Sequence, residues 1–267
     1  MRVTPRAHQT QQTTGDTTVQ TLDGKIALIT GAGKNIGRSI ALNFAAQGAT
    51  ILVNGRSDTE AVAAVVAEIN NAGGQAYAAM GDVSDPSAVN ALVERAAKDA
   101  GGIDIVVSNA GLRRKTAFLD MHFDEWREIL SVALDGAFLL AKATAPHMIK
   151  RGGGSFLALS GISTHIGTLN RCHVSASKAG LEGFVRAIAR ELAPHNITCN
   201  CIAPGAIDTE RGASAGPLPS ARAAGDIPLG RSGTVDEIAA TASFLASAGG
   251  AYITGQTIHV NGGAFLT

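Results

Sequence analysis

The sequence predicts a single α/β domain built on a doubly wound parallel sheet of about seven strands, with helices on both faces. Short β-branched runs alternate with longer amphipathic segments from residue 25 onward. Several of the short runs are apolar almost throughout, which a sheet covered on both faces requires. A chain of 267 residues with 45% hydrophobic content can form one large core, and no linker or change of composition divides it after residue 21.

The alternation assigns each element in turn. The strands are expected at residues 25–30, 50–54, 75–79, 103–108, 155–160, 197–202 and 257–260. The helices are expected at residues 36–47, 59–72, 86–100, 124–150, 174–192 and 235–247. Asp85, which precedes a proline, and Thr234 are expected to be N-caps. In such a sheet ligands bind beyond the carboxyl ends of the strands, so the site is expected in the loops that follow them.

Composition excludes several classes of protein. Lys plus Arg and Asp plus Glu both total 22, and this balance argues against a nucleic-acid or membrane-surface binder. No apolar run approaches the roughly 18 residues of a membrane span. The three cysteines fit a reducing, cytoplasmic compartment, and no second ligand pair accompanies Cys199 and Cys201, so no metal is expected. Residues 1–21 are polar, lack the apolar core of a signal peptide, and are expected to form a disordered tail before a domain at residues 22–267.

The first strand is followed by a loop suited to phosphate. The segment Thr30-Gly31-Ala32-Gly33-Lys34-Asn35-Ile36-Gly37 leads into the first helix. Gly31 permits a tight exit from the strand, Gly37 permits close helix packing, and the helix N-terminus offers N–H groups to a pyrophosphate. The common dinucleotide pattern requires glycine where Ile36 stands, so this loop alone leaves a purely structural turn as the alternative.

Three further segments follow other expected strands: Asp82-Val83 after the third, Ser108-Asn109-Ala110-Gly111 after the fourth and Pro204-Gly205-Ala206-Ile207-Asp208-Thr209 after the sixth. Together with the first loop, they make the chain resemble the classical short-chain dehydrogenase/reductase family, from Leu22 to Phe265. The resemblance implies a Rossmann-like fold that binds a nicotinamide dinucleotide. Asn35 replaces the middle glycine of the family's first motif, and asparagine tolerates the left-handed backbone of such a turn. The positions that the resemblance assigns to the cofactor are Gly31, Gly33, Lys34, Asn35, Ile36, Arg56, Asp82, Val83, Asn109, Ala110, Gly111, Lys178, Pro204, Gly205, Ile207 and Thr209.

Charge at the end of the second strand favours NADP(H) over NAD(H). An NAD enzyme usually places an acid there, whereas this chain has Gly55 followed by Arg56, with Lys34 expected nearby. Two cations suit the 2′-phosphate of NADP. Asp58 is the counter-evidence, but it falls three positions late and is better explained as a helix N-cap.

The chain departs from the family at the catalytic positions. The family places Tyr and Lys four residues apart on one helix face, with a Ser thirteen residues before the Tyr and an Asn on the preceding long helix. Here Lys178 is present, but Val174, Gly161 and Ala133 stand at the other three positions. None of these three side chains transfers a proton, so the usual mechanism is excluded.

Other donors lie close by in the sequence. The candidates for catalysis are Lys178, His173, His165 and Ser160. His173 and His165 rank equally as proton donors because imidazole titrates near neutral pH. His173 is five residues from Lys178, about 140° around a helix, so flanking the helix entrance is the alternative for it.

Cations and a long loop surround the expected cleft. Arg113, Arg114, Lys115, Arg171 and Arg211 would suit an anionic substrate, with an ordinary solvated cluster as the alternative. Residues 208–232 form a long segment rich in Gly, Pro and Ser, read as a substrate lid or else as a surface insertion.

Three functional hypotheses follow. The first is an NADP(H)-dependent oxidoreductase acting on a small carbonyl, imine or alkene with a non-standard proton donor. The second is a non-redox lyase, isomerase or cyclase on the same scaffold, and the third is a non-catalytic NADP(H)-binding protein. The resemblance also implies a homo-oligomer, a tetramer or a dimer, formed through the two long helices.

Overall fold

A computed structural model describes residues 21–209 and 227–267. The expected tail at residues 1–21, apart from residue 21, and residues 210–226 of the expected lid lie outside these ranges. Seven parallel strands form one sheet in the order β3-β2-β1-β4-β5-β6-β7. The strands are β1 (Ile26–Ile29), β2 (Thr50–Gly55), β3 (Gln75–Met80), β4 (Ile105–Ser108), β5 (Gly154–Leu159), β6 (Ile197–Pro204) and β7 (Thr257–Val260). All seven lie within two residues of their expected bounds, which confirms the predicted fold class.

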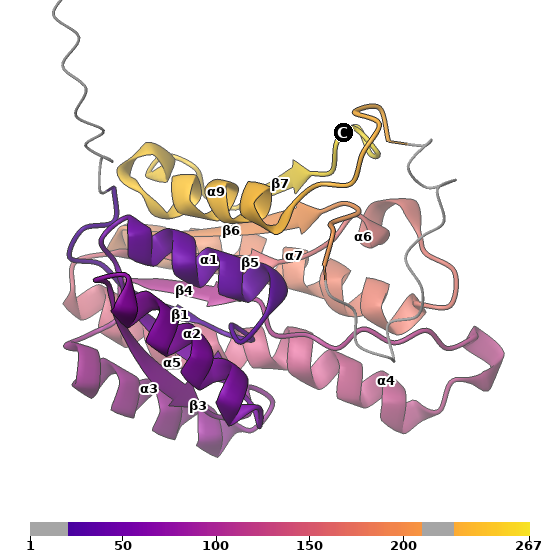
Figure 1. Ribbon diagram of the computed structural model, residues 1–267. Coiled ribbons are helices and arrows are strands. Elements are labelled where there is room, and N and C mark those ends of the chain that lie inside the picture. Colours follow the sequence, from indigo (N-terminus) through magenta and orange to yellow (C-terminus); the bar gives the residue numbers. More distant parts are fainter. Residues whose placement is uncertain (1–20, 210–226) are drawn as a thin grey trace, which may run out of the picture.

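The helices form two layers, one on each face of the sheet (Figure 1). One layer comprises α1 (Asn35–Ala46), α2 (Thr59–Asn71) and α9 (Val235–Ala246). The other comprises α3 (Pro86–Ala100), α4 (Phe123–Leu130), α5 (Gly136–Lys150) and α7 (Cys172–Leu192). A short helix, α6 (Ser163–Ile166), lies between β5 and α7 and was not predicted. Four residues are too few to show a helical period in the sequence.

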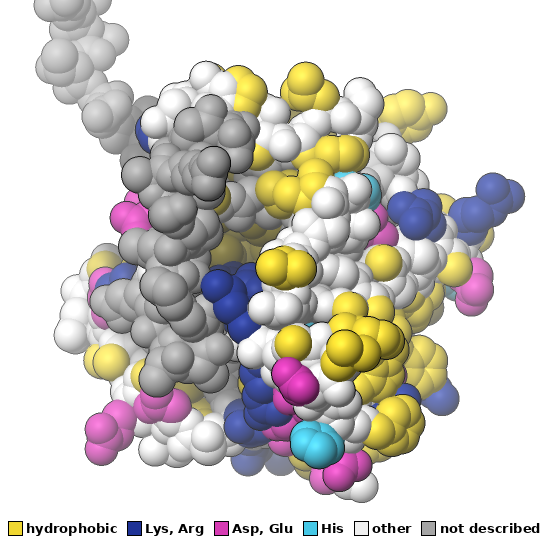
Figure 2. Space-filling model, turned by 90° about the vertical axis from the view of Figure 1, so that its right-hand side faces the viewer, with side chains coloured by type: hydrophobic (Ala, Val, Ile, Leu, Met, Phe, Trp, Pro, Cys, Tyr) yellow, Lys and Arg dark blue, Asp and Glu magenta, His cyan; other side chains and the backbone are white. Residues whose placement is uncertain are grey.

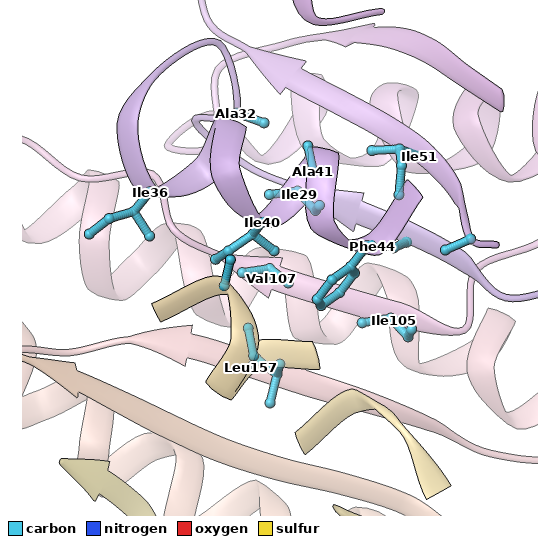
Figure 3. Packing of buried hydrophobic residues seen from close by; sticks show 14 of the residues in the cluster. Ile29, Ala32, Ile36, Ile40, Ala41, Phe44, Ile51, Ile105, Val107 and Leu157 are labelled. Atoms are coloured by element: carbon cyan, nitrogen blue, oxygen red, sulfur yellow. The ribbon is translucent and has the colours of Figure 1, made fainter. Parts of the chain in front are cut away.

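Each face of the sheet has its own core. Alternate strand residues point to opposite faces, so Ile29 and Val107 pack under α1 while Leu28 and Val106 pack on the other side. Figure 3 shows the first cluster, in which Phe44 lies over the central strands. The strands are therefore apolar on both faces, as the sequence pattern indicates.

The predicted helix at 124–150 is continuous but contains one irregular turn. A π-helical turn, η2 (Ser131–Asp135), separates α4 from α5. The stretch Phe123–Lys150 is long and apolar enough to cross a membrane by those criteria alone, and 44% of its most apolar window is buried in the fold. It packs against α3 and α7, so its apolar surface contributes to a helical layer.

The expected N-caps are present. Asp85 accepts hydrogen bonds from the N–H groups of Ser87 and Ala88, and Thr234 forms a full capping box with Glu237. Strand order reverses between β1 and β4, which are neighbours in the sheet. In doubly wound sheets this reversal opens a crevice at the carboxyl ends of the strands.

Candidate active site

The loop after β1 adopts the backbone that its sequence predicts. Gly31 and Asn35 both have left-handed conformations, with φ of 61° and 52°. Asparagine at position 35 therefore supports the turn that the family's glycine would make. Helix α1 begins at Asn35, directly after this turn.

Gly37 is held to glycine by contact with its surroundings. A Cβ atom there would lie 2.4 Å from the carbonyl oxygen of Gly31 and 2.6 Å from Nδ2 of Asn109. Asn109, in the loop after β4, donates hydrogen bonds from Nδ2 to the carbonyl oxygens of Thr30 and Gly31, at 2.9 and 3.1 Å. The two loops at the strand-order reversal are thus bonded into one unit, with Ala110 also donating to Thr30 Oγ1.

The N-terminus of α1 has a different cap from those of the neighbouring helices. Lys34 occupies the N-cap position, and its side chain forms no capping bond. In contrast, Asp58 caps α2 and Asp85 caps α3 with carboxylate oxygens. An uncapped N-terminus leaves N–H donors and the positive end of the helix dipole for an anion, so this loop fits a pyrophosphate.

The end of β2 carries a cation and has no room for an acid. A Cβ atom on Gly55 would lie 2.5 Å from Cγ2 of Val62. Asp58 accepts a hydrogen bond from the Ala61 N–H, which confirms its role as a helix cap. Arg56 is more than half exposed and lies 4.0 Å from Asp82.

Asp82 and Val83 line the loop after β3. Burial alone would raise the pKa of Asp82, but bonds from the backbone and hydroxyl of Ser84, with the charge of Arg56, hold that pKa below its usual range. Val83 packs against Gly136 at the start of α5. Asp82 is therefore an ionised acceptor at neutral pH.

The segment after β6 is fixed by β7 and carries an unsatisfied hydroxyl. The N–H of Gly205 donates to the Val260 carbonyl, and a Cβ on Gly205 would lie 2.7 Å from Asn261 Cα. Ile207 forms an isolated bridge with Gly233. Within the described residues, Oγ1 of Thr209 is buried without a hydrogen-bond partner. A buried polar atom of this kind fits a segment that binds a polar ligand group, such as a carboxamide.

The three positions without a proton donor lie in separate elements. Ala133 is buried in the π-helical turn η2, Val174 lies in the first turn of α7, and Gly161 follows β5. Among the described residues, a Cβ atom on Gly161 would meet only Ser163 Oγ at 3.8 Å and the Pro204 carbonyl oxygen at 4.0 Å. Glycine there is thus not a steric requirement of the fold.

Lys178 on α7 reaches the carboxyl ends of β4 and β5. Its ammonium group donates a hydrogen bond to the carbonyl oxygen of Leu159, at the end of β5. Nζ also lies 3.7 Å from the place of a Cβ on Gly111, so the lysine reaches the loop after β4. Burial, and next the positive charge of Arg113, lower the pKa of Lys178 to about 8. This side chain can release a proton near neutral pH.

His173 faces the interior between α4 and α7. Its side chain is fully buried, and Nε2 lies 3.1 Å from Oε1 of Glu125. The same carboxylate oxygen accepts a 2.6 Å hydrogen bond from Thr116. This bond, opposed by burial and aided by His173, holds the pKa of Glu125 below its usual range. The structure therefore places His173 in a helix–helix contact.

Ser160 and His165 both bind one buried carboxylate, that of Glu182 on α7. Ser160 Oγ donates to Oε1 of Glu182 at 2.5 Å, and His165 Nε2 lies 3.2 Å from the same oxygen. The ring of His165 also stacks on Phe265, with centroids 4.9 Å apart, and meets the edge of His259 at 4.8 Å. Ser160 and His165 are therefore brought together at Glu182, whereas His173 lies between α4 and α7.

Glu182 was not singled out in the sequence, although a signal was available. It lies among Leu181, Val185 and Ala189, which are buried on α7, and it is four residues from Lys178. An acid on the apolar face of a helix is expected to have polar partners. Its partners could not be named because they come from the loop after β5.

The cations that the sequence analysis groups around the expected cleft interact with different residues in the structure. Arg114 pairs with Glu128, whereas Arg113 acts electrostatically on Lys178. Figure 2 shows Lys and Arg side chains gathered in the central and lower parts of the face that it draws. Arg211 lies outside the described residues.

Cys199 and Cys201 are buried in β6, where burial raises both thiol pKa values to about 12, so they pack as neutral side chains, as predicted.

Comparisons with known proteins agree with this geometry. Residues 31–264 match the family model described as enoyl-(acyl carrier protein) reductase. The chain is 37% identical to the 3-oxoacyl-[acyl-carrier-protein] reductases of Aquifex aeolicus and Escherichia coli, over 91% of this chain and 98% of each relative.

Solved structures of dehydrogenases superpose closely on this chain. A putative short-chain alcohol dehydrogenase from Sinorhizobium meliloti superposes with a TM-score of 0.87 at 37% identity, covering 92% of this chain and 98% of that one. A 7α-hydroxysteroid dehydrogenase complexed with NADH and 7-oxo glycochenodeoxycholic acid gives a TM-score of 0.87 at 35% identity, covering 92% and 96%. The chain belongs to the short-chain dehydrogenase/reductase family of oxidoreductases.

Proposed function

We propose that this protein is an NADP(H)-dependent oxidoreductase that reduces a small carbonyl, imine or alkene with a non-standard proton donor. The observation that carries the proposal is the intact nucleotide half of the site beside a catalytic half that keeps only Lys178. The loops after β1 and β4 remain bonded to each other, and the α1 N-terminus has no side-chain cap. A fold alone would not support a reaction, so the proposal depends on these contacts.

The charges at the end of β2 support NADP(H). Gly55 leaves no carboxylate to accept bonds from ribose hydroxyls, and Asp58 is engaged as a helix cap. Arg56, directly after β2, and Lys34, in the loop after β1, are exposed cations suited to a 2′-phosphate. NADPH, when bound, would supply the hydride.

Among the predicted donors, Lys178 is the group we assign to proton transfer. Ser160 and His165 are bound to Glu182, and His173 is buried against Glu125. The lowered pKa of Lys178 lets its ammonium group give a proton to the substrate oxygen as hydride reaches the carbon. The amine then regains a proton from solvent, so one hydride and one proton are added per turnover.

The substrate is proposed to be a small molecule with an anionic or strongly polar group. Arg113 lies close enough to Lys178 to lower its pKa, so the cleft carries concentrated positive charge. A 3-oxoacyl thioester is the first substrate to test, because the relatives are reductases of that class. No nucleic-acid or membrane partner is proposed.

Position 174 favours a second candidate, a lyase, isomerase or cyclase that uses the same cleft. Val174 carries no proton, and Lys178 with a pKa near 8 could also act as a base without any hydride transfer. The two candidates differ in whether NADPH is oxidised during turnover.

Titration of the protein with NADPH and, separately, NADH tests the cofactor proposal. We expect NADPH to bind more tightly, and Arg56→Ala to weaken NADPH about tenfold while leaving NADH unchanged, because one charge-assisted contact is lost. Arg190→Ala, at an exposed position on α7, is the matched control. Failure to bind either nucleotide would refute the redox proposal and favour the second candidate.

Steady-state kinetics of Lys178→Met test the proton donor. With NADPH and a 3-oxoacyl thioester, kcat should fall about 100-fold or more, whereas exposed Lys150→Met should match the wild type. In the wild type, kcat should decrease above pH 8, by about tenfold per pH unit, because the neutral amine has no proton to give. A rate that stays constant to pH 10 would contradict the assignment.

We also propose that the protein forms a homotetramer or homodimer in the cytoplasm. Phe138 on α5 is 47% exposed and forms an edge contact with Phe184 on α7, so these two helices present apolar surface. The free cysteines fit a reducing compartment. Mass measurement in solution at micromolar concentration should give a dimer or tetramer, and a monomer would refute this part.

A further inference from the structure

The absence of a side chain at position 161 leaves the site without its usual hydroxyl, but another hydroxyl lies beside that place. Oγ of Ser163 is 3.8 Å from where a Cβ on Gly161 would stand. A side chain at 161 would therefore be in van der Waals contact with the Ser163 hydroxyl. The carbonyl oxygen of Pro204, at the start of the segment that reaches Thr209, is the other atom near this place.

The other hydroxyls of this segment have structural partners. Ser160 Oγ donates to Glu182, and Thr164 Oγ1 donates to the Gly161 carbonyl at 3.1 Å and lies 3.3 Å from Glu182. Ser163 is held differently, because its backbone carbonyl accepts a 3.3 Å bond from Ser175 Oγ. The contact that fixes Ser163 thus involves its main chain and not its hydroxyl.

The segment that carries Ser163 is anchored on both sides. Glu182 binds Ser160 before it and Thr164 and His165 after it. The N–H of Ile162 donates to the Pro204 carbonyl at 3.1 Å. A donor fixed in this way needs little reorganisation when charge develops on a substrate oxygen.

We propose that Ser163 is a catalytic residue that binds the substrate oxygen in place of the serine missing at position 161. This inference rests on the proposed oxidoreductase function. The hydroxyl donates a hydrogen bond to the carbonyl oxygen as that oxygen gains negative charge, and the bond strengthens as the charge grows. Ser163 keeps its own proton, and the transferred proton comes from Lys178.

The role of the Ser163 hydroxyl can be tested by removing it and placing a hydroxyl at position 161 instead. Ser163→Ala should lower kcat/KM for reduction of an acetoacetyl N-acetylcysteamine thioester by NADPH at least about tenfold, with NADPH affinity unchanged. The double variant Ser163→Ala/Gly161→Ser should recover most of the loss, because position 161 has space for a side chain. Thr168→Ala, an exposed hydroxyl loss in the following loop, is the matched control.

The same comparison is made in a Val174→Tyr chain, which supplies a family-type phenol as the proton donor in place of the Lys178 ammonium group. If only the Val174→Tyr chain turns over, the proposed native chemistry fails, and the serine series in that chain still decides the role of Ser163. An unchanged rate in Ser163→Ala, or no recovery with Gly161→Ser, would overturn the proposal. No turnover and no calorimetric binding of the thioester in either chain would overturn it as well.

Discussion

The proposed nucleotide half and the proposed catalytic half of the site lie at the same edge of the sheet but depend on different kinds of atoms. In the first half the backbone is the functional group: Gly37 has no room for a Cβ, which would lie 2.4 Å from a carbonyl oxygen. In the second half side chains are the functional groups, and at Gly161 a Cβ would meet no atom of the described ranges closer than 3.8 Å. A catalytic side chain can therefore be absent without strain, whereas the phosphate loop cannot change without displacing its neighbours.

Gly37→Ala tests this contrast most severely. The new methyl group would overlap the Gly31 carbonyl and the Asn109 amide, so we expect NADPH affinity to fall about 100-fold or more, with a loss of stability of about 2 kcal/mol. Isothermal calorimetry and urea denaturation measure the two effects. Gly183→Ala in α7 is the control, since no atom of residues 21–209 or 227–267 lies within 4 Å of its Cβ position, and it should stabilise the helix by about 0.5–1 kcal/mol. Wild-type affinity in Gly37→Ala would show that the backbone of this half is not rigid.

Glu182→Gln addresses the catalytic half alone. The carboxylate accepts bonds from Ser160 and His165, and replacing it with an amide weakens these charge-assisted contacts. We expect the free energy of unfolding to fall by about 2 kcal/mol and turnover to decrease, with NADPH affinity within about twofold of the wild type. Exposed Glu191→Gln on the same helix is the control. A parallel loss of nucleotide affinity would show that the two halves are coupled.

Glu237→Gln examines an ion pair that lies outside both halves. The bond from Arg231, with others from Thr234, lowers the pKa of Glu237 from 4.5 to about 2. A carboxylate whose pKa is lower in the folded state stabilises the fold above its unfolded pKa and loses that effect as the pH falls. The wild type should therefore lose stability between pH 4.5 and 2 more steeply than Glu237→Gln, in urea midpoints measured across that range. Equal slopes would show that this exposed pair contributes nothing, and turnover should be unaffected in either case.

The phosphate loop and the caps were predictable because their signals are local. Asn35 in a left-handed turn, and Asp58, Asp85 and Thr234 as N-caps, each depend on residues within a few positions along the chain. The strands were predictable because burial on both faces leaves an apolar run in the sequence. The short helix α6 and the π-helical turn η2 interrupt longer patterns without a period of their own, so they were not predicted.

The partners of the candidate donors could not be predicted for a different reason. His173 and Glu125 are 48 residues apart, and His165 and Glu182 are 17 apart. Such pairs form only when α4, α6 and α7 are packed, and the sequence left His165 and His173 equally ranked. The structure separates them, since His173 is fully buried between helices, whereas His165 contacts the buried carboxylate of Glu182, which also accepts a hydrogen bond from Ser160.

The sequence by itself determined the fold class, the order of the elements, the tight turn after the first strand and the side chains of Ala133, Gly161 and Val174, which carry no transferable proton. These are properties of local spacing and of residue identity, which do not depend on how distant segments meet. Only the tertiary structure decided which donors are engaged, that Lys178 is buried near Arg113, and that the hydroxyl of Ser163 lies beside the empty position at Gly161. Hydrogen bonding and burial are set by distances between atoms of different elements, and packing alone fixes those distances.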